Sequence, residues 1–307
     1  MSSSSLSASF LLALSAARDA AGSQHYPVGT LYVVATPIGN LADISLRALH
    51  VLGLVDAVAC EDTRHTRQML NAYGLDRPAH SLLALHQHNE SQAAQAVLQR
   101  LSSGERVAYV SDAGTPAISD PGARLVQAVQ AAGHRVMPLP GASSVTTLLS
   151  GAGMEGDGFV FHGFLPAKPT DRQRAVADLS MQTRAVVLLE APHRIEATAQ
   201  ALAVLGPRRI TVGRELTKQF EQIVTLAASE LAAWLALRPE HLRGEFALLL
   251  HAAPASGQVP SEGLRVLRCL LAELPLKSAV RLAADITGEA RNTLYEQALA
   301  LKAADQP

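Results

Sequence analysis

The sequence predicts an α/β protein with two α/β domains and a small, all-helical C-terminal piece. Short apolar runs alternate with helical patterns from Gly29 to His251, a pattern typical of sheets covered by helices. The glycine-rich stretch Gly151–Gly158 interrupts this alternation and indicates a domain boundary. Beyond Ala252–Pro260, which is rich in Ala, Pro, Ser and Gly, only helical patterns remain. We therefore expect α/β domains at 29–150 and 151–255, and a helical piece at 261–303.

The composition is that of a soluble globular protein. The chain has 307 residues, of which 48% are hydrophobic and 17% charged, with a formal net charge of −1. Such a balance argues against a protein that coats nucleic acid by charge alone, but permits a local basic face. Cys60 and Cys269 have no metal-ligand spacing, and we expect a buried Cys60 thiol and a reducing, cytoplasmic setting. No run reaches the ~18 apolar residues of a membrane span.

Residues 1–28 stand apart from the rest of the chain. They are rich in Ser and Ala, and the apolar run Phe10–Leu14 resembles the core of a signal peptide. However, no Lys or Arg precedes that run, as a signal peptide requires. We expect a disordered N-terminal extension, with a secretion signal as the alternative.

The first domain is expected to contain five strands, namely Thr30–Ala35, Val55–Cys60, Leu82–His86, Val107–Val110 and Arg135–Leu139. Helical patterns lie between and after them, with Asp43 as the expected N-cap of the first and then Thr66–Tyr73, Glu90–Leu101, Ala123–Ala131 and Val145–Leu149. Asp120 is a suitable N-cap, and Pro121 a suitable first residue, for the helix that follows them.

In the second domain the expected strands are Phe159–Phe164, Ala185–Leu189, Ile210–Val212, Gln222–Leu226 and Phe246–His251. The expected helices are Asp171–Ser180, Arg194–Leu205 and Ser229–Leu237. The segment Lys168–Glu215 holds eight Lys or Arg against five Asp or Glu. This surplus indicates an anionic partner, or simply a solvated helix face.

Two short helices are predicted within Gly263–Ala303. Ala279, Leu282, Ala283 and Ile286 recur at helical spacing, Thr287–Gly288 ends that helix, and Asn292 can cap the next. A helix-turn-helix that contacts nucleic acid has this form. A helical hairpin that closes the core or a dimer interface has it as well, and basic and acidic residues are mixed here.

Three loops of small residues follow strands in the first domain, namely Thr36–Asn40, Ser111–Pro116 and Pro140–Ser144. Ligands bind at the carboxyl ends of strands in open α/β sheets, and Gly and Ala let a ligand approach the backbone. Ordinary strand-to-helix connections are the alternative. The sequence contains no G-x-G-x-x-G after a strand, no phosphate loop, no G-x-S-x-G elbow and no Cys/His metal set, so no metal is expected.

The polar side chains near these loops are candidates for chemistry. Glu61 and Asp62 end the second strand, and Asp112 follows the fourth. Arg64 and Arg67 come just after the first pair, where they contact a substrate or pair with the carboxylates.

Seven motifs in this order resemble a known family: TPIGNLxDI from Thr36, EDTR from Glu61, SDAGTPxISDPG from Ser111, PGASS from Pro140, FLPxK from Phe164, EAPHRI from Glu190 and GRELTK from Gly213. The family is that of the ribosomal small-subunit RNA (cytidine-2′-O)-methyltransferases, within the tetrapyrrole-methylase-like (class III) S-adenosylmethionine-dependent methyltransferases. The resemblance covers Gly29–Ala303. It implies two α/β domains with S-adenosylmethionine in the cleft between them, and a homodimer.

The resemblance also implies roles for individual residues. Contacts to the methyl donor fall on Ile38, Gly39, Asp112, Ala113, Gly114, Thr115, Ile118, Ser143, Ser144 and Glu190. The implied reaction methylates the ribose 2′-hydroxyl of a cytidine at the decoding site of 16S rRNA, within the small ribosomal subunit. Such a hydroxyl benefits from a nearby base.

Among the carboxylates Glu61, Asp62 and Asp112 we favour Asp62 as that base, with Arg64 orienting the ribose or its phosphate. The RNA side is assigned to Lys168, Arg172, His193, Arg194 and Arg214, and the C-terminal helices are expected to bind RNA. A tetrapyrrole methyltransferase of the same fold, or a non-catalytic RNA-binding protein, are the competing hypotheses.

Overall fold

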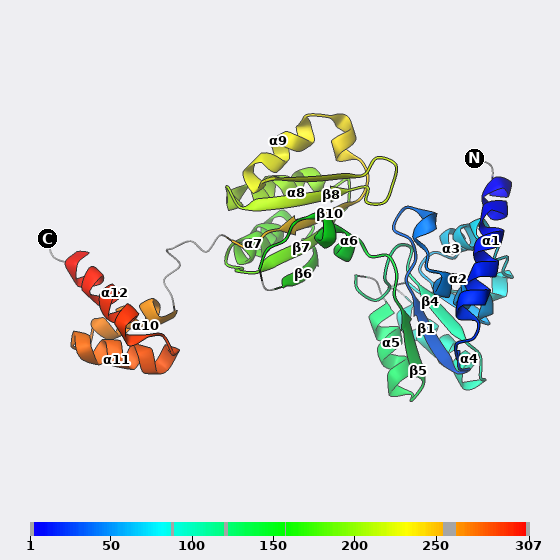
Figure 1. The fold of residues 1–307 in the computed structure, drawn as a ribbon, viewed down its shortest axis with the longest axis horizontal. Coiled ribbons are helices and arrows are strands. Elements are labelled where there is room, and N and C mark those ends of the chain that lie inside the picture. Colours follow the sequence, from blue (N-terminus) through cyan, green and yellow to red (C-terminus); the bar gives the residue numbers. More distant parts are fainter. Residues whose placement is uncertain (1–2, 87–88, 120–121, 157, 254–261, 305–307) are drawn as a thin grey trace. The chain divides into compact units, whose positions relative to one another are not determined.

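The computed structural model describes residues 3–86, 89–119, 122–156, 158–253 and 262–304. The chain divides into two compact units, Met1–Ala252 and Ala253–Pro307 (Figure 1). The first unit contains both α/β halves and the second contains the C-terminal helices. None of the described helices is long and apolar enough to cross a lipid bilayer.

The first half is built on a five-stranded, all-parallel sheet with the strand order β3-β2-β4-β1-β5. Its strands are β1 (Thr30–Val34), β2 (Ala57–Cys60), β3 (Leu82–Ala84), β4 (Val107–Val110) and β5 (Arg135–Leu139). All five predicted strands are confirmed. Every residue of β1, β2 and β4 is buried, Cys60 included. Parallel strands covered on both faces have this continuous apolar character.

Alternate residues of each strand pack on opposite faces of this sheet. Tyr32 and Val34 share a core with α2 (Leu46–Leu54) and α3 (Thr63–Ala72). Leu31 and Val33 instead share a core with α4 (Glu90–Ser102) and α5 (Gly122–Ala131). The sheet is therefore covered by helices on both faces, as the alternation of strand and helix patterns predicts.

Helix starts in this half differ in detail from the prediction. Ser45, not Asp43, is the N-cap of α2, and its hydroxyl accepts the Ala48 N–H at 3.1 Å. Asp43 lies in the preceding 3₁₀ turn, Leu41–Asp43. Asp120 and Pro121, the expected cap and first residue of α5, lie outside the described residues.

The expectation of a disordered N-terminal extension is wrong for residues 3–21, which form α1 (Ser3–Ala21). Ala17 and Ala21 are buried, and the Phe10 ring makes an edge contact with Tyr73 at 4.9 Å between centroids. The Tyr26 hydroxyl donates to the Ala21 carbonyl at 3.0 Å and closes the end of the helix. Apolar residues spaced three or four apart give α1 one inward face, and this burial outweighs the weak helix propensity of its serines.

The second half is built on a mixed sheet with the order β6-β7-β10-β8-β9. Its strands are β6 (Phe159–Phe164), β7 (Ala185–Glu190), β8 (Arg209–Arg214), β9 (Gln222–Ala227) and β10 (Phe246–Leu250). β6 is parallel to β7, whereas β10 runs antiparallel to both β7 and β8. One face packs on α7 (Pro169–Ser180), α8 (Ile195–Leu202) and α9 (Leu231–Ala236).

The opposite face of that sheet packs on α6 (Ser144–Gly151), which comes from the first half of the chain. Leu148 of α6 is fully buried beside Val187 and Leu249, and Ile38 joins the same cluster. The expected boundary at residue 150 assigned α6 to the first domain. Its packing instead gives the two halves a shared apolar core.

The second unit contains α10 (Glu262–Leu271), α11 (Leu276–Thr287) and α12 (Arg291–Ala304) around a small apolar core. Gly288 ends α11 in the left-handed conformation at φ 77°, as expected for a glycine after a helix. One detail differs from the prediction. Asn292 lies inside α12 rather than capping it.

Candidate active site

A cavity of about 370 Å³ lies between the two halves of the first unit, beyond the carboxyl ends of β1, β4 and β5. We call it the first cavity. Nine of the ten expected donor contacts line it, namely Ile38, Asp112, Ala113, Gly114, Thr115, Ile118, Ser143, Ser144 and Glu190. The second half supplies the rest of the wall, including Phe161, Leu216 and Ala247.

Backbone hydrogen bonds hold the first two small-residue loops side by side. The Thr36 N–H donates to the Gly114 carbonyl at 2.9 Å, and the Gly114 N–H donates back at 3.0 Å. The Thr36 hydroxyl donates to the Ser111 carbonyl at 3.2 Å. Gly114 has a φ of +81°, and a Cβ there would lie 3.2 Å from Cγ2 of Ile38. Glycine therefore suits this position both for its backbone conformation and for the close approach of Ile38.

The third loop joins the second through a side chain. The Thr115 hydroxyl donates to the Ala142 carbonyl at 3.1 Å. Ser143 is the N-cap residue of α6, and its side chain makes no capping hydrogen bond. The first N–H groups of a helix have no partners within that helix. Ser143 and Ser144, at this helix start, line the cavity, so donors are available there for a polar ligand.

The charged side chains that line the first cavity are all carboxylates: Asp112, Glu190 and Glu245. No Lys or Arg occurs among its described lining residues. Glu190 is 3% exposed and is fixed by an ion pair with Arg194 at 3.0 Å and by the Thr198 hydroxyl at 2.6 Å. Such a lining favours a cationic organic ligand over one that carries several phosphates.

A larger second cavity, of about 860 Å³, shares a wall with the first. Ile38, Asp112, Ala113 and Glu245 line both cavities, and Gly39, the tenth expected donor contact, lines only the second. The basic residues Arg64, His65 and Arg67 of α3 line it, together with Lys218. The charged side chains of the first cavity are all carboxylates, whereas the second cavity also has basic side chains that can bind an anionic ligand.

Asp62 caps α3 and lines neither cavity. Its carboxylate accepts the N–H groups of Arg64 at 2.8 Å and His65 at 3.4 Å, and it pairs with the Arg64 guanidinium at 3.0 Å. Hydrogen bonds from the Arg64 side chain and backbone lower the pKa of Asp62 from 3.8 to about 2. A carboxylate so stabilised is a weak proton acceptor. The structure thus argues against Asp62 as the general base and gives it a capping role.

Asp112 is the candidate base that lines both cavities, whereas Glu61 lines neither. One Asp112 carboxylate oxygen accepts the Asp62 N–H at 3.3 Å. Arg64 lines the second cavity with a side chain 91% exposed, and its guanidinium pairs with Asp62.

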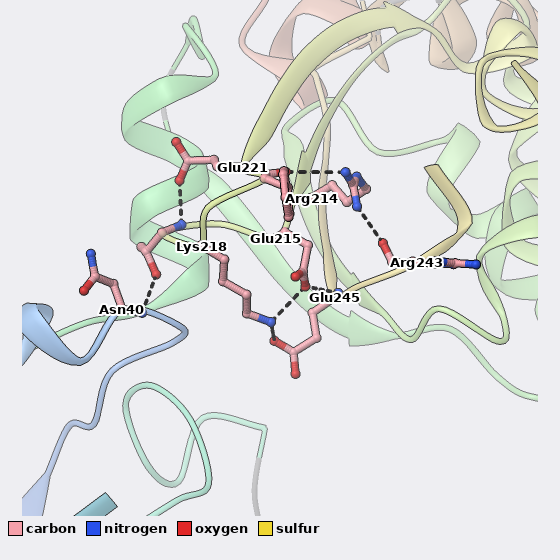
Figure 2. Close-up of polar contacts among 9 residues, drawn as sticks. Asn40, Arg214, Glu215, Lys218, Glu221, Arg243 and Glu245 are labelled. Carbon is pink, nitrogen blue, oxygen red and sulfur yellow. Dashed lines mark hydrogen bonds and ion pairs between the residues drawn. The ribbon is translucent and has the colours of Figure 1, made fainter. Parts of the chain in front are cut away.

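Three of the five residues assigned to RNA make hydrogen bonds or ion pairs within the protein. Arg172, 9% exposed, donates to the Ala167 carbonyl at 3.2 Å. Arg194 pairs with Glu190. Arg214, 5% exposed, donates to Gln222 and to the Arg243 carbonyl, each at 2.9 Å (Figure 2). Lys168 and His193 are exposed and remain open to a ligand.

Sequence reasoning placed Glu190 of the second half at the donor site but missed other residues of that half that line the cavities. Lys218 and Glu245 line the second cavity, and Leu216 lines the first. Lys218 and Leu216 belong to the Gly213–Lys218 motif, and that motif could have identified them as cavity residues. No feature of the sequence around Glu245 identifies it as a cavity residue. In the described part of the chain, no group of three His, Cys, Asp or Glu side chains is arranged to hold a metal ion.

Comparison with known proteins shows the family to which this chain is similar. Residues 30–232 match the family described as Tetrapyrrole (Corrin/Porphyrin) Methylases, and residues 257–302 match the RsmI C-terminal HTH domain. A relative in Pseudomonas aeruginosa named Ribosomal RNA small subunit methyltransferase I is 48% identical over 88% of this chain and 97% of its own length. The protein of the same name in Escherichia coli O157:H7 is 45% identical over 88% of this chain and 95% of its own.

A solved structure shows the same fold at much lower identity. The uroporphyrin-III-C-methyltransferase of Thermus thermophilus superposes with a TM-score of 0.51 at 18% identity, over 73% of this chain and 94% of that one. This likeness covers the α/β part and confirms the predicted two-sheet architecture.

Proposed function

The chain belongs to the tetrapyrrole methylase family and, within it, to the ribosomal RNA small subunit methyltransferase I proteins, and from this membership we propose its reaction. The protein is a methyltransferase that uses S-adenosylmethionine to methylate the ribose 2′-hydroxyl of a cytidine at the decoding site of 16S rRNA. The observation that carries the proposal is the first cavity, which collects nine expected donor contacts from loops far apart in the chain.

The residues of the first cavity suit this methyl donor. The Asp112 carboxylate complements a sulfonium or ammonium group, whereas the carboxylates of Glu190 and Glu245 already pair with Arg194 and Lys218. The N-terminus of α6, at Ser143 and Ser144, suits the carboxylate of the donor. A volume of about 370 Å³ lies within the range of pockets for ligands of this size.

The bound donor supplies an already activated methyl group, so the protein has mainly to position the acceptor. Holding two reactants in line contributes a large part of the rate enhancement in such transfers. Asp112 lies at the wall between the cavities, and we assign it the role of accepting the 2′-hydroxyl proton. This assignment replaces Asp62, whose carboxylate is engaged in capping α3.

The second cavity suits the RNA. Arg64 and Arg67 project from α3 with exposed side chains, and phosphate oxygens are the natural partners of such guanidinium groups. A nucleotide has to be turned out of its stack to reach a cavity of this kind. Its 2′-hydroxyl distinguishes RNA from DNA.

The C-terminal unit supports RNA binding away from the cavities. Its match to a helix-turn-helix domain and the exposed Arg265, Arg268, Arg281 and Arg291 favour that role. We further propose a homodimer that acts in the cytoplasm on the small ribosomal subunit. Light scattering of the purified protein tests the dimer, because a monomeric mass at micromolar concentration would contradict it.

The reaction is tested with labelled S-adenosylmethionine and small subunits from a strain that lacks this enzyme. We expect label in 2′-O-methylcytidine after digestion of 16S rRNA to nucleosides. Label in a base, or label only in an added tetrapyrrole, would contradict the proposal. Naked 16S rRNA serves as a second substrate to show whether assembly is needed.

Two variants refine the assignment. Asp112→Asn keeps an oxygen that can accept the Asp62 N–H but removes the base, and we expect kcat to fall by about 10²-fold or more. Deletion of residues 253–307 leaves the first unit complete, so donor affinity is expected to persist while KM for the RNA rises. Unchanged kinetics after that deletion would remove the C-terminal unit from the RNA site.

A further inference from the structure

We infer that the loop Glu215–Lys218, between β8 and β9, fixes the position of the first small-residue loop, Thr36–Asn40, which we call the first donor-binding loop. Thr217 and Lys218 then act as positioning residues for the methyl donor. This inference rests on the proposed function, because it takes Ile38 and Gly39 as donor contacts. The family motif contains the loop Glu215–Lys218, and Lys218 also lines the second cavity, but no role in holding the methyl donor has been assigned to the loop so far. We call it the latch loop.

The latch loop contacts the first donor-binding loop directly. The Asn40 N–H donates to the Thr217 hydroxyl oxygen at 3.1 Å, across 177 residues of sequence. Gly39 packs against the same two side chains. A Cβ on Gly39 would lie 2.4 Å from Cγ of Lys218 and 3.1 Å from the Thr217 hydroxyl. Any larger residue at position 39 would therefore displace the loop or Lys218.

The latch loop also shares an apolar cluster with Ile38. Leu216, which follows Glu215 in the chain, is 6% exposed and belongs to the same apolar cluster as Ile38. Both side chains line the first cavity. Thus three consecutive residues of the first donor-binding loop, Ile38 to Asn40, are in contact with, or in the same cluster as, three consecutive residues of the latch loop.

The backbone of the latch loop is held in an uncommon conformation. Glu215 and Thr217 have φ values of 51° and 67°, and Ala117 is the other described non-glycine residue with positive φ. Left-handed backbone at such residues is unfavourable because the Cβ atom approaches the following carbonyl oxygen. Strain of this kind persists where surrounding contacts over-determine the conformation, and it concentrates at functional sites.

Those surrounding contacts are present in the loop (Figure 2). Lys218 Nζ lies 2.8 Å from a Glu215 carboxylate oxygen and 3.2 Å from one of Glu245. The Glu215 carboxylate also accepts the Glu245 N–H at 3.0 Å, and the Glu221 carboxylate accepts the Thr217 N–H at 2.5 Å. Burial lowers the pKa of Lys218, but the bonds to Glu215 and Glu245 outweigh it and raise the pKa, so the ammonium stays charged.

The test measures donor affinity, with S-adenosylhomocysteine as the probe, by calorimetry on the full-length protein. Thr217→Val keeps the shape of the side chain but cannot accept the Asn40 N–H. We expect its Kd for the probe to rise by about fivefold, the worth of one hydrogen bond, while kcat at saturating donor stays near that of the wild type. Thr217→Ser restores the acceptor and should restore Kd.

Thr225→Val is the matched control. Thr225 shares a hydrogen bond of 2.7 Å with Thr211 inside the second half, away from the latch loop. The variant Thr225→Val also replaces a threonine hydroxyl by a methyl group and also loses one hydrogen bond. It should therefore lower Tm without altering the Kd for S-adenosylhomocysteine. A fall in Tm for Thr217→Val with an unchanged Kd would overturn the inference, because the loop would then be structural only.

A double-mutant cycle tests the Gly39 contact. Gly39→Ala alone should weaken probe binding, and Lys218→Ala in the same chain should recover part of that loss by making room for the new methyl group. Strictly additive effects on Kd would contradict direct packing between these residues. If the wild-type protein itself did not bind the probe, the proposed function would fail, and with it the premise of this inference.

Discussion

Gly114→Ala offers the sharpest test of the donor cavity, because a second glycine provides a nearly identical control. Gly114 has φ +81°, and Gly133 has φ +79°, so alanine pays the same left-handed penalty of about 1–2 kcal/mol at either position. The surroundings differ. At Gly114 the new Cβ would lie 3.2 Å from Cγ2 of Ile38, whereas at Gly133 no atom lies within 4 Å.

Both variants should lose about the same stability, which for a chain of this size corresponds to a fall in Tm of roughly 2–4 °C per kcal/mol. Only Gly114→Ala should alter donor binding. In this variant the Ser111–Pro116 loop can relieve the strain by leaving the conformation that binds the donor. Donor binding must then restore that conformation, which weakens the observed affinity. A cost of about 1–2 kcal/mol corresponds to a Kd for S-adenosylhomocysteine raised by about 5–30-fold.

The assay is calorimetric titration of each variant with S-adenosylhomocysteine, alongside thermal unfolding by circular dichroism. Equal Kd values for the two variants and the wild type would refute the placement of Gly114 in the donor site. A loss of affinity in Gly133→Ala as large as that in Gly114→Ala would show that general destabilisation, rather than the loop, controls binding.

Three further predictions concern capping, the shared core and the N-terminal helix. Asp62→Ser retains a helix cap and should keep kcat, whereas loss of a catalytic base would lower kcat by ~10²–10⁴-fold. Folding lowers the Asp62 pKa from 3.8 to about 2. The wild-type protein should therefore be more stable than Asp62→Ala by a constant amount above pH 5, and urea unfolding should show this difference vanish as the pH falls from about 4 to 2. Leu148→Ala should cost about 2–5 kcal/mol of unfolding free energy, whereas Leu237→Ala, at a side chain 73% exposed, should stay within about 0.5 kcal/mol. Ala17→Asp, at a fully buried position, should lower Tm and leave donor Kd unchanged, and Leu12→Asp, 83% exposed on the same helix, should alter neither.

The strands and the small-residue loops that follow them could be predicted because their signals are local. A buried strand such as Val107–Val110 is a short apolar run, and the turn residues that follow it mark the loop. Its neighbours at the carboxyl edge of a parallel sheet follow from topology. The motif resemblance then predicted ten residues as contacts of the methyl donor, and nine of the ten line one cavity.

The sequence was least informative where a side chain had two possible partners. Asp62 and Arg214 carry charges that suit catalysis or RNA, and the sequence does not show that one caps a helix and the other bonds carbonyls. Similarly, α1 lacks any family motif, and its inward face is recognisable only beside Tyr73. Tertiary contacts between distant segments decided each case, and a local pattern does not contain them.

The core shared by Ile38, Leu148 and Leu249 has a consequence for synthesis on the ribosome. Leu148 of α6 emerges about 100 residues before Leu249 of β10, the strand against which it packs. At about 5–20 residues per second, its apolar face stays uncovered for roughly 5–20 s. During that interval the nascent first half exposes the apolar face of α6 that β10 later covers, which makes it a natural place for a chaperone to bind.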